Sequence, residues 1–373
     1  MSFASGHDIM EIIQKVVKSL WQAFLSVRLP QSFPIMTYSE AISNYGCDKP
    51  DLRIPFPHFA SIGHMVPADL TSMITTLNKS VIEAMVVPLQ CTPHDSKSLL
   101  AAFFGTTEGQ SFLDNPDGAP GIFIYDSKRP LSGLSAFGFE AAEWLEQEND
   151  LADGYVIVLQ ARPGLAHSGG STMLGNLRTA LFWAAVRAGH LPAPSWSLFR
   201  PIWITDFPLF SPINPDEPGQ GGNAGLASTH HPFTSPKTPE DVDLLMHDPR
   251  SVTGNHFDLV INGEEIGGGS QRIHHAAMQE YIFRKILKMD ESRISEFRHL
   301  LEALRAGCPP HAGMALGFDR LVAMMVSSIQ ERTLGVRDVV AFPKTGKGDD
   351  PMMMSPGRLT DDVLETYHLQ LAS

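Results

Sequence analysis

The sequence predicts an α+β fold, in which an antiparallel sheet with flanking helices is accompanied by a separate, inserted α+β module. Three observations support this prediction. Residues 258–272 contain a hairpin signal, residues 8–27 have the apolar spacing of a buried helix, and residues 58–200 alternate strand-like and helix-like segments. A chain of 373 residues is long enough for two or three domains, each with its own core.

The composition is that of a globular protein, with 43% apolar and 18% charged residues. A net charge of -13 argues against an overall field that attracts nucleic acid, so RNA contact needs a local basic face or a separate domain. Cys47, Cys91 and Cys308 are far apart and form no CxxC pair, which indicates reduced thiols and disfavours zinc or a disulfide framework. We expect no membrane span, signal peptide or Arg-rich presequence.

Residues 1–57 are predicted to form a helix and an ordered connector. Apolar residues recur at helical spacing from about Asp8 to Val27, and Ser5 is placed to cap this helix. A second short helix follows Thr37, because Glu40 three residues later completes a capping-box pattern. Residues 45–53 are predicted to form a structural loop with local ion pairs.

Residues 58–200 are predicted to form the inserted module, which could fold alone. Strands are expected at 86–89, 121–125 and 155–160, and helices at 141–147 and 175–188. The glycine cluster at 168–172 lacks the Gly-Lys-Ser/Thr ending of a P-loop, so we interpret it as the approach to a helix.

Residues 201–373 hold most candidate site residues. A strand at 203–210 leads into a loop at 211–229 that is rich in Gly, Pro and Asn, and then to His230 and His231. Adjacent side chains in an extended segment point in opposite directions, which argues against a shared zinc ion. Two alternatives stay open: hydrogen bonding to an anionic substrate, and a solvent-facing loop.

The hairpin signal is Asn262-Gly263, because a type I′ turn needs positive φ at both central residues. A two-residue loop pairs Ile261 with Glu264, Val260 with Glu265 and Leu259 with Ile266. Asp258 then shares a face with Glu265, and the two carboxylates are roughly 7–8 Å apart at the backbone.

That separation suits two acids sharing a hydrated divalent cation on a polyphosphate. Arg272 follows three glycines that let a ligand approach the backbone, and its planar fork suits a carboxylate substrate held beside Mg-ATP. On the hairpin alone, an edge hairpin with solvated acids is the favoured alternative.

Covering helices are predicted at 276–287 and 291–306. A short strand then runs into a helix at 309–321, where Gly313 and Gly317 leave an edge free for a flat ring. Arg320 opens this helix, where a guanidinium can stack on a purine and reach a phosphate, and Asp319 is interpreted as its cap. A buried strand is expected at 336–344 and a terminal helix at 361–371.

Together these segments resemble the aspartyl-tRNA synthetases of bacterial and mitochondrial type, a class II aminoacyl-tRNA synthetase family. Residues 317–320 (Gly-Phe-Asp-Arg) resemble class II motif 3, residues 265–274 the aspartate-binding stretch, and residues 230–236 the loop that closes over the amino acid. Residues 33–38, 45–53 and 337–344 are similar to further family signatures, and residues 58–200 correspond in position to the inserted domain. The resemblance covers nearly the whole chain.

The resemblance implies an aspartate–tRNA ligase that uses ATP and Mg. Arg272 would bind the aspartate side-chain carboxylate, Glu265 would hold Mg-ATP with Asp258 beside it, and Arg320 would pack on adenine. The substrate-binding residues so implied are His230, His231, Gly268, Ser270 and Arg272. Those for ATP are Asp258, Glu265, Gly317, Phe318, Asp319 and Arg320; of these, Asp258 and Glu265 would hold Mg, while Glu265 and Arg320 would act in catalysis.

Residues 1–3 align just after motif 2, so we expect this chain to lack motifs 1 and 2 and the anticodon-binding barrel. Motif 2 strands would pair beside the hairpin, and their loss predicts an exposed sheet edge there. Motif 1 builds the family's dimer interface, so a homodimer of this chain, although possible, would lack that interface.

The expected partners are L-aspartate, ATP and tRNA(Asp), without a membrane, in the cytoplasm or the mitochondrial matrix. Two alternatives stay open. One is a non-catalytic paralogue that binds aspartate or an adenylate, or pairs with a full-length synthetase. The other is a synthetase-like ligase acting on a small molecule.

Overall fold

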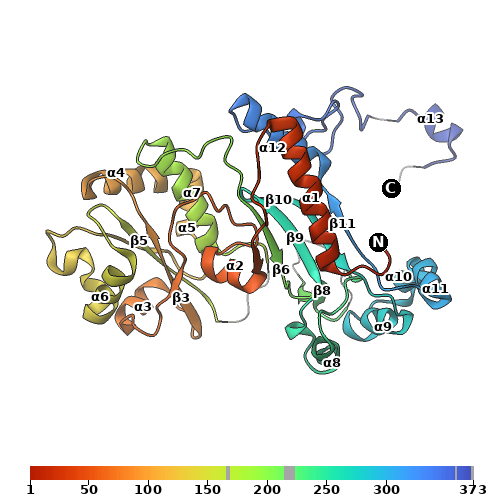
Figure 1. The fold of residues 1–373 in the computed structure, drawn as a ribbon, viewed down its shortest axis with the longest axis horizontal. Helices are drawn as coiled ribbons and strands as arrows, with labels where there is room; N and C mark the ends of the chain where they lie inside the picture. Colours follow the sequence, from red (N-terminus) through yellow and green to blue (C-terminus); the bar gives the residue numbers. More distant parts are fainter. Residues whose placement is uncertain (165–168, 214–222, 358, 371–373) are drawn as a thin grey trace. The chain divides into compact units, whose positions relative to one another are not determined.

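The computed structural model describes residues 1–164, 169–213, 223–357 and 359–370 (Figure 1). The chain divides into two compact units, residues 1–315 and 316–373, and each is described by itself. The structure contains two larger sheets, in which most neighbouring strands are antiparallel, together with helices, and this confirms the predicted α+β class. Within the described residues, no helix has the length and apolar character needed to cross a membrane.

A five-stranded sheet organises the candidate site (Figure 1). Its order is β1-β6-β9-β10-β11, formed by β1 (Ile35–Thr37), β6 (Pro201–Thr205), β9 (His256–Ile261), β10 (Glu264–Gln271) and β11 (Ala312–Leu316). Strand β1 is parallel to β6, whereas β9 is antiparallel to both β6 and β10. Every residue of β9 is buried, so any polar side chain on this strand is held away from bulk solvent.

The hairpin formed by β9 and β10 has the predicted turn. Asn262 and Gly263 both have positive φ, at 55° and 85°, as a type I′ turn requires. Ile261 pairs with Glu264 and Val260 with Glu265, as expected, but the predicted pairing of Leu259 with Ile266 is wrong. The register shifts between Glu265 and Gly267, because a bulge adds one residue to β10. Gly268 therefore lies opposite Asp258.

The hairpin does not lie at an edge of the sheet. Strand β6 pairs with β9 on one side, and β11 neighbours β10 on the other. The expectation of an exposed edge beside the hairpin is therefore wrong, since both flanks are occupied by strands of this chain. The outermost strands are β1 and β11. This enclosure also explains the burial of the acid on β9.

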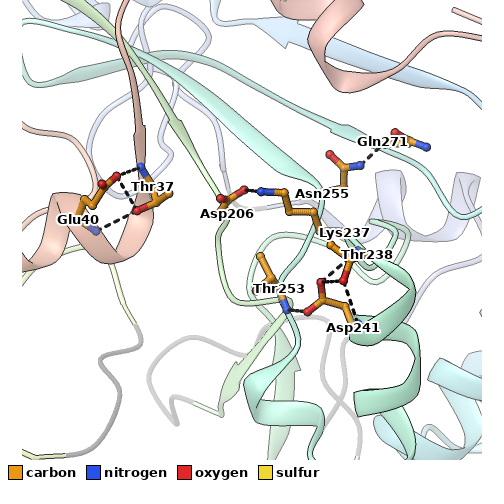
Figure 2. Close-up of polar contacts among 9 residues, drawn as sticks. All are labelled: Thr37, Glu40, Asp206, Lys237, Thr238, Asp241, Thr253, Asn255 and Gln271. Atoms are coloured by element: carbon orange, nitrogen blue, oxygen red, sulfur yellow. Dashed lines mark hydrogen bonds and ion pairs between the residues drawn. The ribbon is translucent and has the colours of Figure 1, made fainter.

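Helices α1 (Gly6–Leu25) and α2 (Tyr38–Tyr45) begin at the predicted capping boxes. The Ser5 hydroxyl accepts from the Asp8 backbone N–H, and the Thr37 hydroxyl accepts from Glu40 in the same way (Figure 2). Helix α1 starts and ends about two residues earlier than its apolar spacing predicted. Its buried side carries Val17 and Trp21, both 0% exposed.

Residues 60–163 contribute a four-stranded sheet with the order β2-β3-β5-β4. The strands are β2 (Ala60–Ser61), β3 (Ser80–Val87), β4 (Gly121–Ile124) and β5 (Val156–Pro163), all antiparallel to their neighbours. Alternate residues of β5 face two separate cores: Val156 and Val158 pack in one, and Ile157 and Leu159 in the other. The strands predicted at 121–125 and 155–160 are confirmed as β4 and β5, whereas the strand predicted at 86–89 overlaps only the last two residues of β3.

Helices cover both faces of this sheet. They are α3 (Ala68–Ile74), α4 (Pro93–Phe104), α5 (Thr107–Leu113), α6 (Gly138–Asn149) and α7 (Met173–Arg187), with short 3-10 turns at Pro130–Gly133 and Ser135–Phe137. The Thr172 hydroxyl accepts from the Gly175 backbone N–H and caps α7. The glycine cluster is therefore the approach to a helix, as predicted, although Ser168 lies outside the described residues.

A further group of elements packs beside β9 and β10. It comprises β7 (Phe210–Pro212), β8 (Leu226–Ser228), α8 (Pro239–His247), a 3-10 turn at Pro249–Ser251, α9 (Ala276–Tyr281), a π-helical segment at Ile282–Ile286, α10 (Glu291–Glu296) and α11 (Arg298–Ala306). The helix predicted at 291–306 is two helices, because Phe297 departs from helical backbone angles (φ -93, ψ 8). Within the loop predicted at 211–229, residues 214–222 lie outside the described residues, whereas residues near its two ends pair as β7 and β8.

The second unit contains α12 (Phe318–Gln330), a 3-10 turn at Val336–Asp338 and α13 (Asp361–Thr366). The cap of α12 is Gly317, so Asp319 lies in the first turn and its interpretation as the cap is wrong. The buried strand predicted at 336–344 is also wrong, since Phe342 is 64% exposed. An apolar run forms a strand only beside a partner edge, and no described strand pairs with this segment.

Candidate active site

The hairpin brings its two predicted carboxylates to one glycine. A Cβ atom built on Gly268 would lie 2.6 Å from Asp258 Oδ1 and 3.7 Å from Glu265 Oε1. It would also lie 3.7 Å from His256 Nε2. The missing side chain of Gly268 therefore lets three polar groups approach the backbone of β10, with Asp258 Oδ1 packed directly against the glycine.

Asp258 is not a solvated acid, since it is 1% exposed. Its Oδ1 lies 2.8 Å from His256 Nε2, whereas its Oδ2 has no hydrogen-bond partner among the described residues. Burial raises the pKa of this carboxyl, against the opposing effects of His230 and Lys49. The favoured alternative for the isolated hairpin, an edge with solvated acids, therefore fails at Asp258. An unpartnered buried carboxylate oxygen is costly unless a ligand satisfies it.

Two further charged residues, Asp48 and Lys49, belong to this cluster. They lie in the loop at 45–53, whose local pattern predicts only a structural role. Lys49 Nζ lies 2.9 Å from Asp48 Oδ2 and 3.7 Å from Glu265 Oε2. Burial depresses the pKa of Lys49, but Asp48 and then Glu265 outweigh it and the net direction is upward. Nearby, Arg53 and Asp51 form the expected local pair at 2.7 Å. Nothing in the local pattern indicated that Lys49 reaches the hairpin.

His256 is another functional candidate that the sequence analysis missed. It is 7% exposed, and its ring stacks on that of His230 with centroids 3.5 Å apart and an interplanar angle of 12°. Burial lowers the pKa of His256 to about 3, so the imidazole is neutral at pH 7. Its placement two residues before Asp258, on the same strand face, was the available signal.

The side chain of His230 is exposed, and its surroundings shift the pKa of the imidazole. Surrounding protein lowers this pKa, and the neighbouring ring of His256 acts in the same direction. One ligand atom from each of His230, His256 and Asp258 could lie within 4.8 Å of the others. Nearly parallel stacked rings, however, direct their in-plane lone pairs side by side rather than toward one point. This geometry does not favour zinc.

Arg272 and His231 form a second polar pair. Arg272 Nη1 lies 3.0 Å from His231 Nδ1, and burial lowers the pKa of the guanidinium. Burial, followed by the charge of Arg272, lowers the pKa of His231 to about 4. Among the described residues, no carboxylate lies within 4.0 Å of Arg272. A half-buried cation that faces a neutral imidazole is suited to bind an anion.

The two adjacent histidines contact different partners, His256 for His230 and Arg272 for His231. This difference follows the expectation for neighbours in an extended segment.

Polar contacts hold the histidine segment against the sheet (Figure 2). Lys237 Nζ lies 2.6 Å from Asp206 Oδ1, at the end of β6. Asp241 completes the capping box of α8, and its Oδ1 accepts from the Thr253 backbone N–H at 2.8 Å. The residues that follow His231 are therefore tied to the end of β6 and to the segment that precedes β9.

Two predicted substrate-binding residues lie on β10. Gly268 occupies the position opposite Asp258, and Ser270 pairs with His256. Ser270 is 0% exposed, and its hydroxyl has no hydrogen-bond partner among the described residues. Beside the acids, Gly268 therefore has no side chain, and Ser270 has a hydroxyl that can form a further hydrogen bond.

The remaining predicted residues belong to the second unit. Gly317, Phe318, Asp319 and Arg320 lie at the start of α12, where Phe318 is 74% exposed. Because the two units are described separately, the participation of these residues in the site stays a prediction.

Comparison with known proteins identifies the class. The family model described as tRNA synthetases class II (D, K and N) matches residues 1–346. The chain belongs to this class II tRNA synthetase family, as its motifs predicted.

Within this family the similarity is to aspartate–tRNA ligases. The chain is 34% identical to the mitochondrial enzyme of Schizosaccharomyces pombe, over 100% of this chain and 57% of that protein. It is also 34% identical to the mitochondrial enzyme of Homo sapiens, over 100% and 54%, respectively. The aspartate–tRNA(Asp/Asn) ligase of Opitutus terrae is 31% identical, over 99% and 58%. The chain spans little more than half the length of the curated relatives that it matches.

Proposed function

We propose that this chain takes part in the ATP-dependent activation of L-aspartate and its transfer to tRNA(Asp). The observation that carries the proposal is the convergence of the Asp258 and Glu265 carboxylates beside Gly268. Arg272 follows at the end of the same strand, with its guanidinium facing a neutral imidazole. Two carboxylates suit the magnesium ion of Mg-ATP, and one guanidinium suits the carboxylate of an acidic amino acid.

The residues present fit a magnesium ion. Mg²⁺ prefers oxygen ligands, and Asp258 and Glu265 supply carboxylate oxygens, one of which has no protein partner. Gly268 has no side chain, which lets the Asp258 carboxylate pack against the backbone of β10 and keep its position beside Glu265. When bound, the ion would neutralise phosphate charge. The role of Asp258 and Glu265 is to hold and orient it, and the burial of Asp258 keeps competing water away.

The proposed aspartate site is built around Arg272. Its planar fork would pair with the side-chain carboxylate of the substrate, displacing the contact to His231. His230 and His231 would then donate or accept hydrogen bonds at the same substrate. Gly268 lets the substrate approach the backbone of β10, and the Ser270 hydroxyl is available to bind it.

The nucleotide base is assigned to the second unit. Arg320, in the first turn of α12, would stack on adenine, with Gly317, Phe318 and Asp319 forming the turn that presents it. In the reaction, an oxygen of the substrate α-carboxylate attacks the α-phosphorus of ATP. The bond to pyrophosphate breaks, and aspartyl-adenylate forms. Positioning and charge neutralisation supply most of the catalysis.

The second step would pass the aspartyl group from the adenylate to the tRNA. The net charge of -13 means that tRNA contact depends on a local basic surface or on another domain. We propose residues 58–200 as the inserted domain, between catalytic segments at 1–57 and 201–373. The names of several relatives support a mitochondrial location, with the cytoplasm as the alternative.

Aspartate-dependent exchange of pyrophosphate into ATP tests this proposal. The chain should support exchange with L-aspartate but not with L-asparagine, because Arg272 requires an anionic side chain. The variant Glu265→Gln should lose exchange while retaining its thermal unfolding midpoint. Absence of exchange by this chain and by a version carrying further N-terminal sequence would overturn the assignment.

A further inference from the structure

We propose that Lys49 is a built-in counterion of the hairpin carboxylates, which occupies the acidic cluster when no divalent cation is bound and competes with the cation for it. By acidic cluster we mean Asp48, Asp258 and Glu265. The inference rests on the proposed function, because two of these acids are the proposed magnesium ligands.

The position of Lys49 is the first support. Its ammonium lies 2.9 Å from Asp48 Oδ2 and 3.7 Å from Glu265 Oε2, so it contacts two carboxylates from different parts of the chain. The side chain of Lys49 is 32% exposed and that of Asp48 is 9% exposed. A charge in this half-enclosed setting is screened less than one on the open surface.

The loop that carries Lys49 is fixed in place. The Asp48 backbone N–H donates to the Gly170 carbonyl at 2.9 Å, and Cys47 forms a β-bridge with Ser171. On the other side, a Cβ on Gly263 would lie 3.1 Å from the Asp51 Cβ, so the loop also packs against the hairpin turn. Lys49 therefore reaches Glu265 from an anchored backbone.

The acidic cluster contains three carboxyl groups, and Lys49 contacts two of them. Asp258 is 1% exposed, and its Oδ2 has no partner among the described residues. Gly268, which has no side chain, lies beside both Asp258 and Glu265 and brings the two carboxylates together. A divalent cation that binds these oxygens meets the positive field of Lys49, and the ammonium can relieve the repulsion by keeping only its shorter contact to Asp48.

Direct binding of Mn²⁺, measured by electron paramagnetic resonance on the full chain, tests the competition. The variant Lys49→Met removes the charge while retaining much of the side-chain length. We expect it to bind Mn²⁺ roughly three- to tenfold more tightly than the wild type, because a like charge beside the ion is lost. The variant Lys49→Arg should bind like the wild type, since it keeps the charge.

A matched control removes the same charge elsewhere. Lys15 forms an exposed ion pair with Glu11 on α1, so Lys15→Met changes the net charge equally without touching the cluster. Its Mn²⁺ affinity should equal that of the wild type. Tighter binding by Lys15→Met, or unchanged or weaker binding by Lys49→Met, would overturn the competition.

The variant Glu265→Gln separates the two proposals. If wild-type binding of Mn²⁺ is lost in Glu265→Gln but Lys49→Met has no effect, the competition is refuted while the proposed function stands. If the wild type and Lys49→Met show no binding that depends on Glu265, both are refuted.

Lysine labelling of the wild-type chain provides a test that does not depend on the folding of a variant. With an amine-acylating reagent and mass spectrometry, saturating Mg²⁺ should increase the labelling rate of Lys49 by a measurable factor, because its contact to Glu265 is released. The rate at Lys15 should stay constant. A decreased or unchanged rate at Lys49 would contradict the competition.

Discussion

Alanine at Gly268 tests the central feature of the candidate site, the close approach of the two hairpin carboxylates to this glycine. The new Cβ would lie 2.6 Å from Asp258 Oδ1, a distance at which one group has to move. Asp258 is buried on a central strand, so it cannot turn out into solvent. Overpacking of this kind costs about 1–3 kcal/mol, partly offset by about 0.4–1 kcal/mol from the smaller entropy of the unfolded chain.

We therefore expect Gly268→Ala to lower the free energy of unfolding by about 1–2 kcal/mol. Mn²⁺ binding should weaken at least about tenfold, because a displaced carboxylate loses a ligand position worth more than 1.4 kcal/mol. Aspartate-dependent pyrophosphate exchange should fall by about two orders of magnitude. Urea unfolding, electron paramagnetic resonance and the exchange assay measure the three effects.

Two other glycines provide controls. A Cβ on Gly269 would lie 2.6 Å from the Gly313 carbonyl oxygen, a backbone atom, so Gly269→Ala should destabilise the protein more than Gly268→Ala. A Cβ on Gly63 would lie no closer than 3.6 Å to its neighbours, so Gly63→Ala should leave stability and Mn²⁺ binding unchanged. Full Mn²⁺ binding and full exchange in Gly268→Ala would refute the argument that the site depends on close packing of Asp258 against Gly268.

Three further predictions concern charge, pH and capping. Arg272→Lys should reduce kcat/KM for aspartate by about 100-fold without changing KM for ATP, since an ammonium cannot replace a planar fork; an equal effect on both substrates would contradict the assignment. Because the folded-state pKa of His256 is lowered to about 3, the unfolded chain binds the extra proton first on acidification. Between pH 7 and pH 5, the free energy of unfolding of the wild type, measured in urea, should therefore fall by about 2 kcal/mol more than that of His256→Asn. Parallel pH profiles of the two proteins would count against a buried neutral ring. Asp241→Ala should cost about 2 kcal/mol, because the box that caps α8 and the bond to the Thr253 N–H are both lost (Figure 2), and a urea midpoint like that of the wild type would show that these bonds contribute little.

Local patterns predicted the elements whose causes are local. The turn at Asn262-Gly263 and the capping boxes at Ser5 and Thr37 depend on groups within about four residues, and each has its predicted form. The class II family followed from short motifs that lie along most of the chain. The strand expected at 336–344 failed because an apolar run does not reveal whether a sheet edge is present to accept it.

The hairpin shows where local reasoning stopped. The sequence predicted its turn and its first two residue pairs, but not the bulge that moved Gly268 opposite Asp258. Register past the turn depends on packing against β6 and β11, which come from distant segments. The same dependence made the isolated acids resemble solvated residues, although Asp258 is enclosed.

By itself, then, the sequence determined the family and the hairpin turn, and it proposed Asp258, Glu265 and Arg272 as site residues. Only the tertiary structure decided that Asp258 is buried beside a stacked pair of imidazoles and that Lys49 contacts Glu265. The physical reason is that burial and ion pairing depend on neighbours in space, and such neighbours can be distant in the chain, as Lys49 and Glu265 are, with more than two hundred residues between them.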